Sequence, residues 1–306
     1  MNGYLYLRRR SHLMTQTVLI LGASGRFGRH AAEAFAQSGW QVRRFDRAHD
    51  DLETAIAGVD VVVSAWNPPG YHLWAEDLLA QHTAVAKAAA REGATVILPG
   101  NVYVYGPDAP SPWRADTPHM ATNPLGLFRK RVEAAYRDNG ATTIVLRCGD
   151  FIDTQKTGNW FETYISPGVP KGFIRYPGDP DAPHAWAFLP DAARAAVALA
   201  EIRGTLTGFN DVPFQGYTLS GRDLARAITR VTGREIGVKP LHWGMMRLVK
   251  PFMPMLAGVF EMRYLWSLPQ RLDGVRLAGL APDFVPTPVE EALRQSLTHQ
   301  QQTKAA

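Results

Sequence analysis

The sequence predicts an α/β fold, in which a doubly wound parallel sheet is joined to a smaller, irregular C-terminal lobe. Three observations predict it. Short apolar runs alternate with helix-like segments through the first 150 residues, a glycine-rich turn follows the first of these runs, and the alternation ends after residue 150. Strands separated by helices need crossover connections, so they form a parallel sheet with helices on both faces.

The first half of the chain is expected to supply the strands of this sheet. The first strand, "TVLIL" (17–21), is a continuous apolar run, typical of a strand that is buried on both faces. A glycine after a helical segment ends the helix, because glycine readily adopts the left-handed backbone found there. The further elements are, in order, a helix ending at Gly39, a strand at 41–46, a short helix ending at Gly58, a strand at 60–65, a helix at 72–92 ending at Gly93, a strand at 94–100, a helix at 121–140 and a strand at 142–149.

The second half is less regular. Residues 151–186 are rich in glycine, proline and aromatic residues and show no clear periodicity, whereas 189–201 is expected to be a helix with Asp191 in its first turn. Another helix is expected at 220–233, with Ser220 as the N-cap that accepts hydrogen bonds from the free N–H groups. This half predicts a lobe over the carboxyl edge of the sheet, where open α/β sheets bind ligands.

Composition and charge exclude several classes of protein. Of the 306 residues, 46% are apolar and 10% aromatic, which indicates a globular protein. The net charge of +5 comes from basic residues placed mostly singly among acidic ones, so we expect no nucleic-acid partner. No run reaches the ~20 apolar residues that cross a bilayer, and the N-terminus lacks the apolar core of a secretory signal. We therefore expect neither membrane association nor secretion.

The cysteine and histidine content points the same way. The single cysteine, Cys148, follows an apolar run and is expected to be a buried, inert thiol in a cytoplasmic protein. The nine histidines are not paired at zinc-ligand spacing, so no metal site is predicted.

The glycine-rich turn is the strongest functional signal. "LILGASGRFGRH" places Gly22, Gly25 and Gly28 where the first strand turns into the first helix. Glycines let the backbone approach a pyrophosphate, and the helix N-terminus supplies N–H groups and partial positive charge, so the turn predicts a dinucleotide site. The alternative is a tight turn that needs glycine for its geometry alone. The residues of this turn expected at the cofactor are Gly22, Ser24, Gly25, Arg26, Phe27 and Gly28.

The choice between NAD and NADP rests on a few charged residues. Asp46 ends the second strand, where a carboxylate can accept both ribose hydroxyls of adenosine and repel a 2′-phosphate. Arg47 follows it and Arg26 lies in the glycine turn, and either guanidinium could instead pair with a 2′-phosphate. The pattern favours NAD while leaving NADP open.

Several motifs together resemble the extended short-chain dehydrogenase/reductases, which include NAD-dependent epimerase/dehydratases and NmrA-like and other atypical members. The motifs are "GASGRFG", the pair Asp51-Leu52, the strand "DVVVSAW" and "NVYVYG". The likeness runs from Met14 to the closing segment "LAPDFVPTPVEEALRQSL". It implies a Rossmann fold with Asp51 and Leu52 against the adenine. It also implies that the nicotinamide half lies against Ala65, Trp66 and Asn67.

The resemblance also exposes a missing acid/base residue. In this family a serine follows the fourth strand, and a tyrosine stands four residues before a lysine that lowers its pKa and holds the nicotinamide ribose. Asn101 stands where the serine is expected. If Lys130 is the lysine, the tyrosine position is Gly126; if Arg129 replaces it, the position is Leu125. Neither Gly126 nor Leu125 has a side chain that can transfer a proton in place of the phenol.

Three interpretations remain open at this point. The protein binds a dinucleotide without dehydrogenation, or another group transfers the proton, or the chemistry needs hydride transfer alone. Tyr103 is the first candidate for the proton, because in an extended segment it would face the same side as Asn101. Tyr105 and His184 are the next candidates, although one of the two tyrosines could equally be a packing residue and a histidine such as His184 is more often a loop residue than a catalyst.

The expected organisation follows from these signals. A disordered tail at 1–13 precedes a dinucleotide-binding domain at 14–165, to which the helix within 187–210 returns, and residues 166–186 and 211–300 form a substrate lobe. We expect an NAD(P)-binding oxidoreductase or epimerase/dehydratase-like protein that acts on an unidentified small molecule. The alternative is a non-enzymatic, dinucleotide-responsive regulator or scaffold. The apolar segment 251–268 could be a partner surface, a homodimer interface or a core helix.

Overall fold

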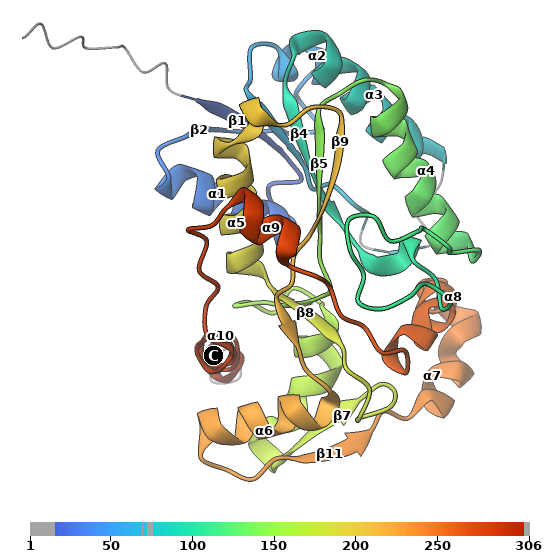
Figure 1. Ribbon diagram of the computed structural model, residues 1–306. Coiled ribbons are helices and arrows are strands. Elements are labelled where there is room, and N and C mark those ends of the chain that lie inside the picture. The colour runs from blue at the N-terminus through green and yellow to red at the C-terminus, as the bar shows by residue number, and fades with distance from the viewer. Residues whose placement is uncertain (1–15, 69, 72–75, 303–306) are drawn as a thin grey trace, which may run out of the picture.

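The computed structural model describes residues 16–68, 70–71 and 76–302 (Figure 1). The tail expected at 1–13 and the start of the helix expected from residue 72 lie outside these residues. A six-stranded parallel sheet has the order β2-β1-β3-β4-β5-β9. Its strands are β1 (Thr17–Leu21), β2 (Gln41–Arg44), β3 (Val61–Ser64), β4 (Thr95–Gly100), β5 (Thr143–Arg147) and β9 (Phe209–Pro213).

Helices cover both faces of this sheet, as predicted (Figure 1). Along β1 the side chains alternate between the two layers: Val18 and Ile20 join the core under α1 and α5, whereas Leu19 and Leu21 join the core under α2, α3 and α4. Both faces are apolar, which explains why the strand sequence is a continuous apolar run. These helices are α1 (Arg26–Gln37), α2 (Leu52–Ile56), α3 (Glu76–Glu92), α4 (Pro124–Asp138) and α5 (Leu189–Glu201).

The strand β9 has no counterpart among the expected elements. It pairs in parallel with β5 at one edge of the sheet. In sequence it crosses the boundary expected between the dinucleotide-binding domain, which includes residues 187–210, and the substrate lobe, which includes residues 211–300. Its sequence "FNDVP" carries Asn210 and Asp211, which are both buried. Arg276 donates to Asn210 Oδ1 at 2.8 Å, and Arg147 binds Asp211. Because other segments satisfy these polar groups, the strand is stable where its own pattern suggests a loop.

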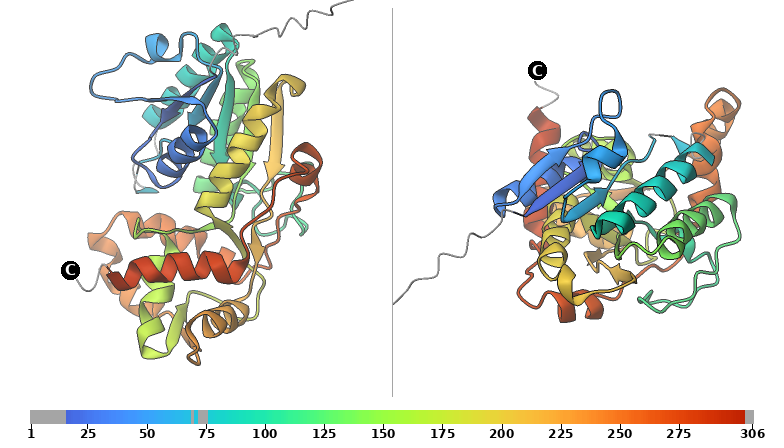
Figure 2. Two further views of the ribbon diagram at one scale, coloured as in Figure 1. Left: turned by 90° about the vertical axis from the view of Figure 1, so that its left-hand side faces the viewer. Right: turned by 90° about the horizontal axis from the view of Figure 1, so that it is seen from above.

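A second lobe lies at the carboxyl ends of the strands (Figure 2). It contains two small sheets, ordered β10-β8-β6 and β11-β7, and the helix expected after Ser220, whose side chain and that of Asp223 form a capping box. Its elements are β6 (Asp150–Ile152), β7 (Phe173–Tyr176), β8 (Ala185–Phe188), β10 (Tyr217–Thr218), β11 (Gly237–Pro240), α6 (Gly221–Thr232), α7 (Trp243–Val249), α8 (Met255–Glu261), α9 (Val275–Leu280) and α10 (Val289–Gln302). Short non-α helical turns lie at 102–104, 161–165, 166–171, 203–205, 250–252 and 262–266.

The apolar segment 251–268 divides into two parts. Phe252 is 84% exposed, whereas Leu256 and Trp266 are buried in the core of the second lobe. The start of the segment is therefore exposed, and six of its eighteen residues are buried. Within the residues that the structure describes, no helix is long and apolar enough to cross a membrane.

Candidate dinucleotide site and the neighbouring strand ends

Two of the three motif glycines are required by close packing of the turn itself. Gly22 has φ +79°, and a Cβ there would lie 2.9 Å from the Ala65 carbonyl oxygen. A Cβ on Gly28 would lie 2.1 Å from the Gly22 carbonyl oxygen, because the first turn of α1 packs directly on the end of β1. No L side chain fits at either place, so these two glycines build the turn.

Gly25 has a different environment. Its backbone, with φ −75°, suits any residue, and a Cβ would meet the Gly22 oxygen at 3.1 Å and otherwise only the Ala65 oxygen, at 4.0 Å. Gly25 is the N-cap of α1, and among the described residues no side chain caps this helix and no acid lies in its first turn. The turn thus presents helix N–H groups beside a glycine without a side chain, which fits the diphosphate of a dinucleotide.

The side chains of the turn point in different directions. Ser24 is exposed and Phe27 is buried. Arg26 does not turn towards β2: its Nε donates to the Thr157 carbonyl and its Nη2 to the Gly158 carbonyl, both at 3.0 Å. This guanidinium therefore links α1 to the second lobe.

A second link lies one turn further along α1. Asp153 of the second lobe is paired with Arg29 and with His30, whose Nε2 lies 3.0 Å from Oδ1. Burial alone would raise the pKa of Asp153, but its bonds with His30 and Arg29 outweigh this and lower the pKa to about 2. The glycine turn is thus anchored to the second lobe by a buried ionic contact.

The end of β2 carries the residues that the sequence analysis expects to distinguish NAD from NADP. Asp46 is exposed; its Oδ1 accepts from the Ala48 N–H at 2.9 Å, and its Oδ2 lies 2.8 Å from His49 Nδ1. These hydrogen bonds lower the pKa of Asp46, and the carboxylate in turn raises the pKa of His49. The Arg47 guanidinium stacks 5.1 Å from the centre of the Trp66 ring. In this arrangement Asp46 is the exposed anion and Arg47 lies over an aromatic face.

The next predicted contacts lie after β2 and β3. Asp51 caps α2, accepting from the Thr54 N–H and hydroxyl at 2.9 Å each, and Leu52 is half-buried. Ala65 and Trp66 present their backbone to Gly22, while the Trp66 ring is buried in the core. Asn67 is exposed at the end of β3.

The segment after β4 is not extended, contrary to the expectation for Asn101 and Tyr103. Residues Val102–Val104 form a 3-10 turn, because the Asn101 side chain caps it by accepting from the Tyr103 N–H at 3.1 Å. The two side chains therefore do not share a face by strand alternation. Val102 and Val104 are buried.

The two tyrosines of this segment have different environments. The Tyr103 hydroxyl lies 2.7 Å from the Tyr71 hydroxyl, and burial raises the pKa of Tyr103 well above its ordinary value. Tyr105 is fully buried and stacks on Trp113 with ring centres 4.6 Å apart. Tyr105 is thus a packing residue, and Tyr103 holds its proton more tightly than a free tyrosine.

The basic residues of α4 point apart. Lys130 Nζ lies 3.4 Å from the Ala121 carbonyl, on the side of the preceding loop. Arg129 is buried and reaches the strand ends, with Nη1 3.5 Å from Asn67 Oδ1 and Nη2 3.3 Å from the Pro99 carbonyl. If the basic residue at the strand ends is Arg129, the tyrosine position four residues earlier is Leu125, which is buried.

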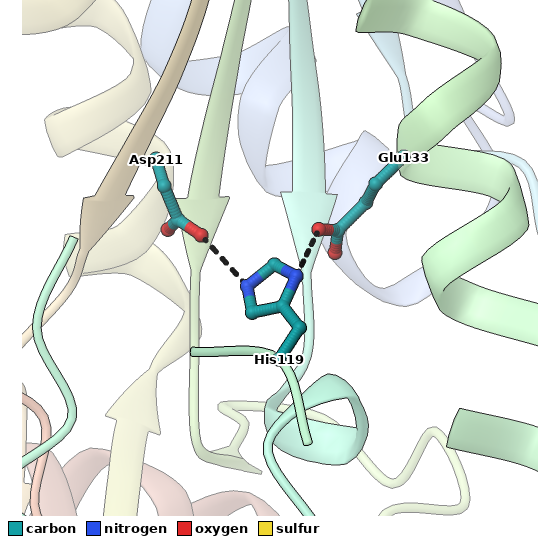
Figure 3. A group of neighbouring side chains, drawn as sticks. All are labelled: His119, Glu133 and Asp211. Carbon is teal, nitrogen blue, oxygen red and sulfur yellow. Dashed lines mark ion pairs between the residues drawn. The ribbon is translucent and has the colours of Figure 1, made fainter. Parts of the chain in front are cut away.

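A buried ionic network fixes α4 to the sheet on one side. Arg147, at the end of β5, donates to both oxygens of Glu133 at 3.0 Å and also binds Asp211 and the Asn101 carbonyl. Burial would raise the pKa of Asp211, but Arg147 and His119 outweigh it and lower the pKa. His119 lies between the carboxylates, 3.7 Å from Glu133 and 3.5 Å from Asp211 (Figure 3).

These side chains resemble a metal-ligand set, since one atom each of His119, Glu133 and Asp211 lie within 4.8 Å of one another. The same carboxylates already bind the Arg147 guanidinium, which offsets one of their two negative charges. We therefore interpret the group as a structural ionic network.

A second buried polar group lies on the other side of α4. The Tyr136 hydroxyl is 2.8 Å from both Ser64 Oγ and His82 Nδ1. All three residues are buried, and burial lowers the pKa of His82 to about 3. The histidine is thus held neutral between α3, α4 and β3.

His184 does not face the site directly. It is buried, its Nε2 lies 2.7 Å from Asp150 Oδ2, and its ring stacks on Trp266 at 4.2 Å. Asp150 was not among the predicted residues. A signal was present, because Asp150 follows the fifth strand as Asn67 follows the third and Asn101 the fourth.

No protein-family model matches the sequence, and no curated protein matches it at a significant level. Solved structures match over 94% of the chain. A nucleoside-diphosphate-sugar epimerase from Pseudomonas aeruginosa has 17% identity and a TM-score of 0.67, over 98% of its own length. UDP-glucuronic acid 4-epimerase from Bacillus cereus, in complex with UDP-glucuronic acid and NAD, has 15% identity and a TM-score of 0.69, over 100%. A dTDP-4-dehydrorhamnose reductase from Clostridium acetobutylicum has 16% identity and a TM-score of 0.68, over 100%.

The chain has the fold of the extended short-chain dehydrogenase/reductases. The doubly wound sheet and the smaller C-terminal lobe predicted from the sequence are thereby confirmed. At these identities the likeness concerns the fold, so the function has to be argued from the residues at the strand ends.

Proposed function

We propose that the chain binds NAD(H) and is an oxidoreductase or epimerase/dehydratase-like enzyme whose acid/base site differs from the usual serine and tyrosine. The observation that carries the proposal is the start of α1 at Gly25, where, within the part of the chain that the structure describes, no side chain caps the helix and no acidic residue lies in its first turn. A matched structure of the same fold, the epimerase from Bacillus cereus, was solved in complex with NAD, which supports this choice of cofactor.

We assign the cofactor contacts as follows. The Gly25 turn holds the diphosphate, and the exposed carboxylate of Asp46 binds the adenosine ribose, which favours NAD over NADP. Asp51 and Leu52 flank the adenine, while Ala65, Trp66 and Asn67 border the nicotinamide half. For the ribose contact that the sequence assigned to Lys130, we propose Arg129 instead, because it is the one of the two that reaches Asn67.

The dinucleotide, when bound, supplies the acceptor or donor of a hydride. The chain must then hold the substrate and manage the accompanying proton. The Asn101 amide can donate a hydrogen bond to a substrate oxygen. The Tyr103 phenol is a weak candidate for the base, since its raised pKa opposes loss of the proton.

The absence of a phenol at both aligned positions of α4 favours a second candidate function, a dinucleotide-responsive regulator without turnover. Leu125 and Gly126 carry no titratable group. Both candidate functions use the same cofactor site, so a measurement of cofactor binding tests both of them together. A measurement of hydride transfer distinguishes the enzyme from the regulator.

The experiment is calorimetric titration of the wild type, Gly25→Val and Gly204→Val with NAD+ and NADP+. A side chain forced into a fitted contact costs about 1–3 kcal/mol, so Gly25→Val should lower NAD+ affinity by roughly tenfold or more. Gly204 is the control: a Cβ there meets nothing within 4 Å, and its neighbour Arg203 pairs with Asp60, just before β3 and at the opposite edge of the sheet. Wild-type protein that binds neither dinucleotide at millimolar concentration would refute the proposal.

A further inference from the structure

Asp150 lies where three neighbouring strands end. Asn67 follows β3, Asn101 follows β4 and Asp150 follows β5, and these strands are adjacent in the parallel sheet. Their carboxyl ends therefore meet at one edge, beyond which ligands of open α/β sheets bind. The Asp150 side chain is 28% exposed, so it is accessible at this edge.

The residues behind Asp150 fix its orientation. Gln270 Nε2 lies 3.1 Å from His184 Nδ1 and also donates to the Leu265 carbonyl, which identifies this Gln270 atom as the amide nitrogen. His184 Nδ1 is then the acceptor, so the proton is on Nε2 and is donated to Asp150 Oδ2 at 2.7 Å. The histidine is buried, and Asp150 is the acceptor of its Nε2–H.

One oxygen of Asp150 is left for a ligand. Within the described part of the chain, no hydrogen bond reaches Oδ1, whereas Oδ2 is held by His184. Burial is the main cause of the raised pKa of Tyr71 and of Tyr103, and the negative charge of Asp150 adds a smaller contribution in the same direction. A tyrosine next to this charge is discouraged from ionising, while the carboxylate itself is an acceptor.

We propose that Asp150 replaces the missing tyrosine as the group that accepts the substrate's hydroxyl proton, with His184 as its positioning residue. The inference rests on the proposed function. Oxidation of a secondary alcohol breaks its C–H bond, whose electron pair leaves with the hydrogen as hydride to the cofactor. It also breaks the O–H bond, whose proton goes to Asp150 Oδ1, and a carbonyl remains.

The charges of the two partners are complementary during this step. The Asp150 carboxylate would complement the positive charge of an oxidised nicotinamide bound at this edge, whereas a reduced ring would be neutral. Loss of that positive charge makes the carboxylate a better proton acceptor at the moment when the substrate oxygen releases its proton. Asp150 should therefore favour NAD+ over NADH, and it should take up a proton more readily when NADH is bound.

These consequences can be measured without knowing the substrate. Calorimetry with NAD+, NADH and ADP-ribose should show that Asp150→Asn weakens NAD+ by roughly threefold to tenfold and leaves NADH and ADP-ribose unchanged. Titrations at acidic pH in buffers of different ionisation heat should show more proton uptake with NADH than with NAD+ in the wild type only. Asparagine keeps an oxygen for His184, so the fold should persist.

The control variant is Asp181→Asn, whose exposed carboxylate pairs with Arg222 and should affect no ligand. Equal loss for all three ligands, or no loss for any, would overturn the role of Asp150 while leaving NAD(H) binding established. A His184→Gln protein should show part of the Asp150→Asn effect, and a full wild-type preference for NAD+ would overturn the positioning role. If the wild type binds no dinucleotide, the proposed function itself fails.

Discussion

Two glycines at the same edge of the sheet show how differently its two halves are built. At Gly25 an added Cβ would meet only the Gly22 oxygen closer than 4 Å, at 3.1 Å. At Gly126, in the first turn of α4, it would lie 2.5 Å from Ala121 Cβ, 2.7 Å from the Tyr103 carbonyl and 2.8 Å from Asn123 Oδ1. The first glycine leaves room for a ligand, and the second is surrounded by protein.

The difference separates cofactor binding from proton transfer. The β1–α1 turn keeps the geometry that a diphosphate needs, so the sequence motif and the structure agree there. At the start of α4 the family's tyrosine is absent, and the surrounding backbone fills the place of a side chain at Gly126. Both regions support the proposal of a retained cofactor site with a different acid/base group.

The α4 region is also the more polar inside. His82 and Tyr136 hold it on one side and Glu133 and Arg147 on the other, whereas α1 relies on Asp153 and its partners. His82 and Asp153 change the stability of the fold in different pH ranges, which allows the two regions to be distinguished in solution.

The largest expected effect is acid destabilisation through His82. Its pKa is 6.5 in the unfolded chain and about 3 in the fold, so the unfolded state binds the proton first. Stability is therefore complete above about pH 6.5 and falls by about 1.4 kcal/mol per pH unit below it, towards about pH 3. Asp153, with a pKa lowered from 3.8 to about 2, loses its contribution only below about pH 4.

Urea unfolding of the wild type and of His82→Gln between about pH 7.5 and 5 measures how steeply the free energy of unfolding changes with pH. This range lies above the pH at which Asp153 takes up its proton. The variant cannot bind the proton, so its stability should depend less on pH by about 1.4 kcal/mol per unit. Equal slopes in both proteins would show that His82 is accessible to protons in the folded state.

The second effect compares the two glycines directly. Gly126→Ala should destabilise the protein by about 1–3 kcal/mol, because the contacts of its Cβ are with backbone and Ala121 and outweigh the gain in helix propensity. Gly25→Ala should cost less than about 1 kcal/mol, since its backbone suits alanine and its Cβ would have one tight contact, with the Gly22 oxygen at 3.1 Å. Similar losses for both variants in urea unfolding would remove the distinction between a ligand-facing and a packing glycine.

Most of the fold could be predicted because its pattern is local. The strand at 17–21 and the helix at 189–201 have the expected bounds, since apolar runs and helix-stopping glycines record them directly. The strand β9 could not be predicted, because Asn210 and Asp211 are satisfied by arginines more than 60 residues away, Arg276 and Arg147. Long-range partners leave no mark in a short window of sequence.

The candidate site was predictable only in part for the same reason. The glycine turn is a local motif, whereas the direction of Arg129 or Lys130 depends on how α4 is rotated against the sheet. The segment at Asn101 was expected to be extended, but one side-chain cap turns it into a 3-10 turn. Asp150 acquires its orientation from His184 and Gln270, which lie far along the chain.

The smallest expected effect tests the outer end of the cofactor region, where Asp46 lies. Its side chain is 60% exposed, so water and salt screen its charge, and Asp46→Ala should shift the affinity ratio towards NADP+ by only about threefold to tenfold. The shift should shrink at high salt, since it is electrostatic. His49→Gln is the matched variant: it removes the neighbour that lies 2.8 Å from Asp46 Oδ2, so this oxygen gains freedom to accept a ribose hydroxyl. In His49→Gln the preference for NAD+ over NADP+ should therefore increase or remain unchanged, whereas in Asp46→Ala it should decrease. An affinity ratio that Asp46→Ala leaves unchanged would show that this carboxylate does not face the ribose, and would leave Gly25 as the main fixed point of the cofactor site.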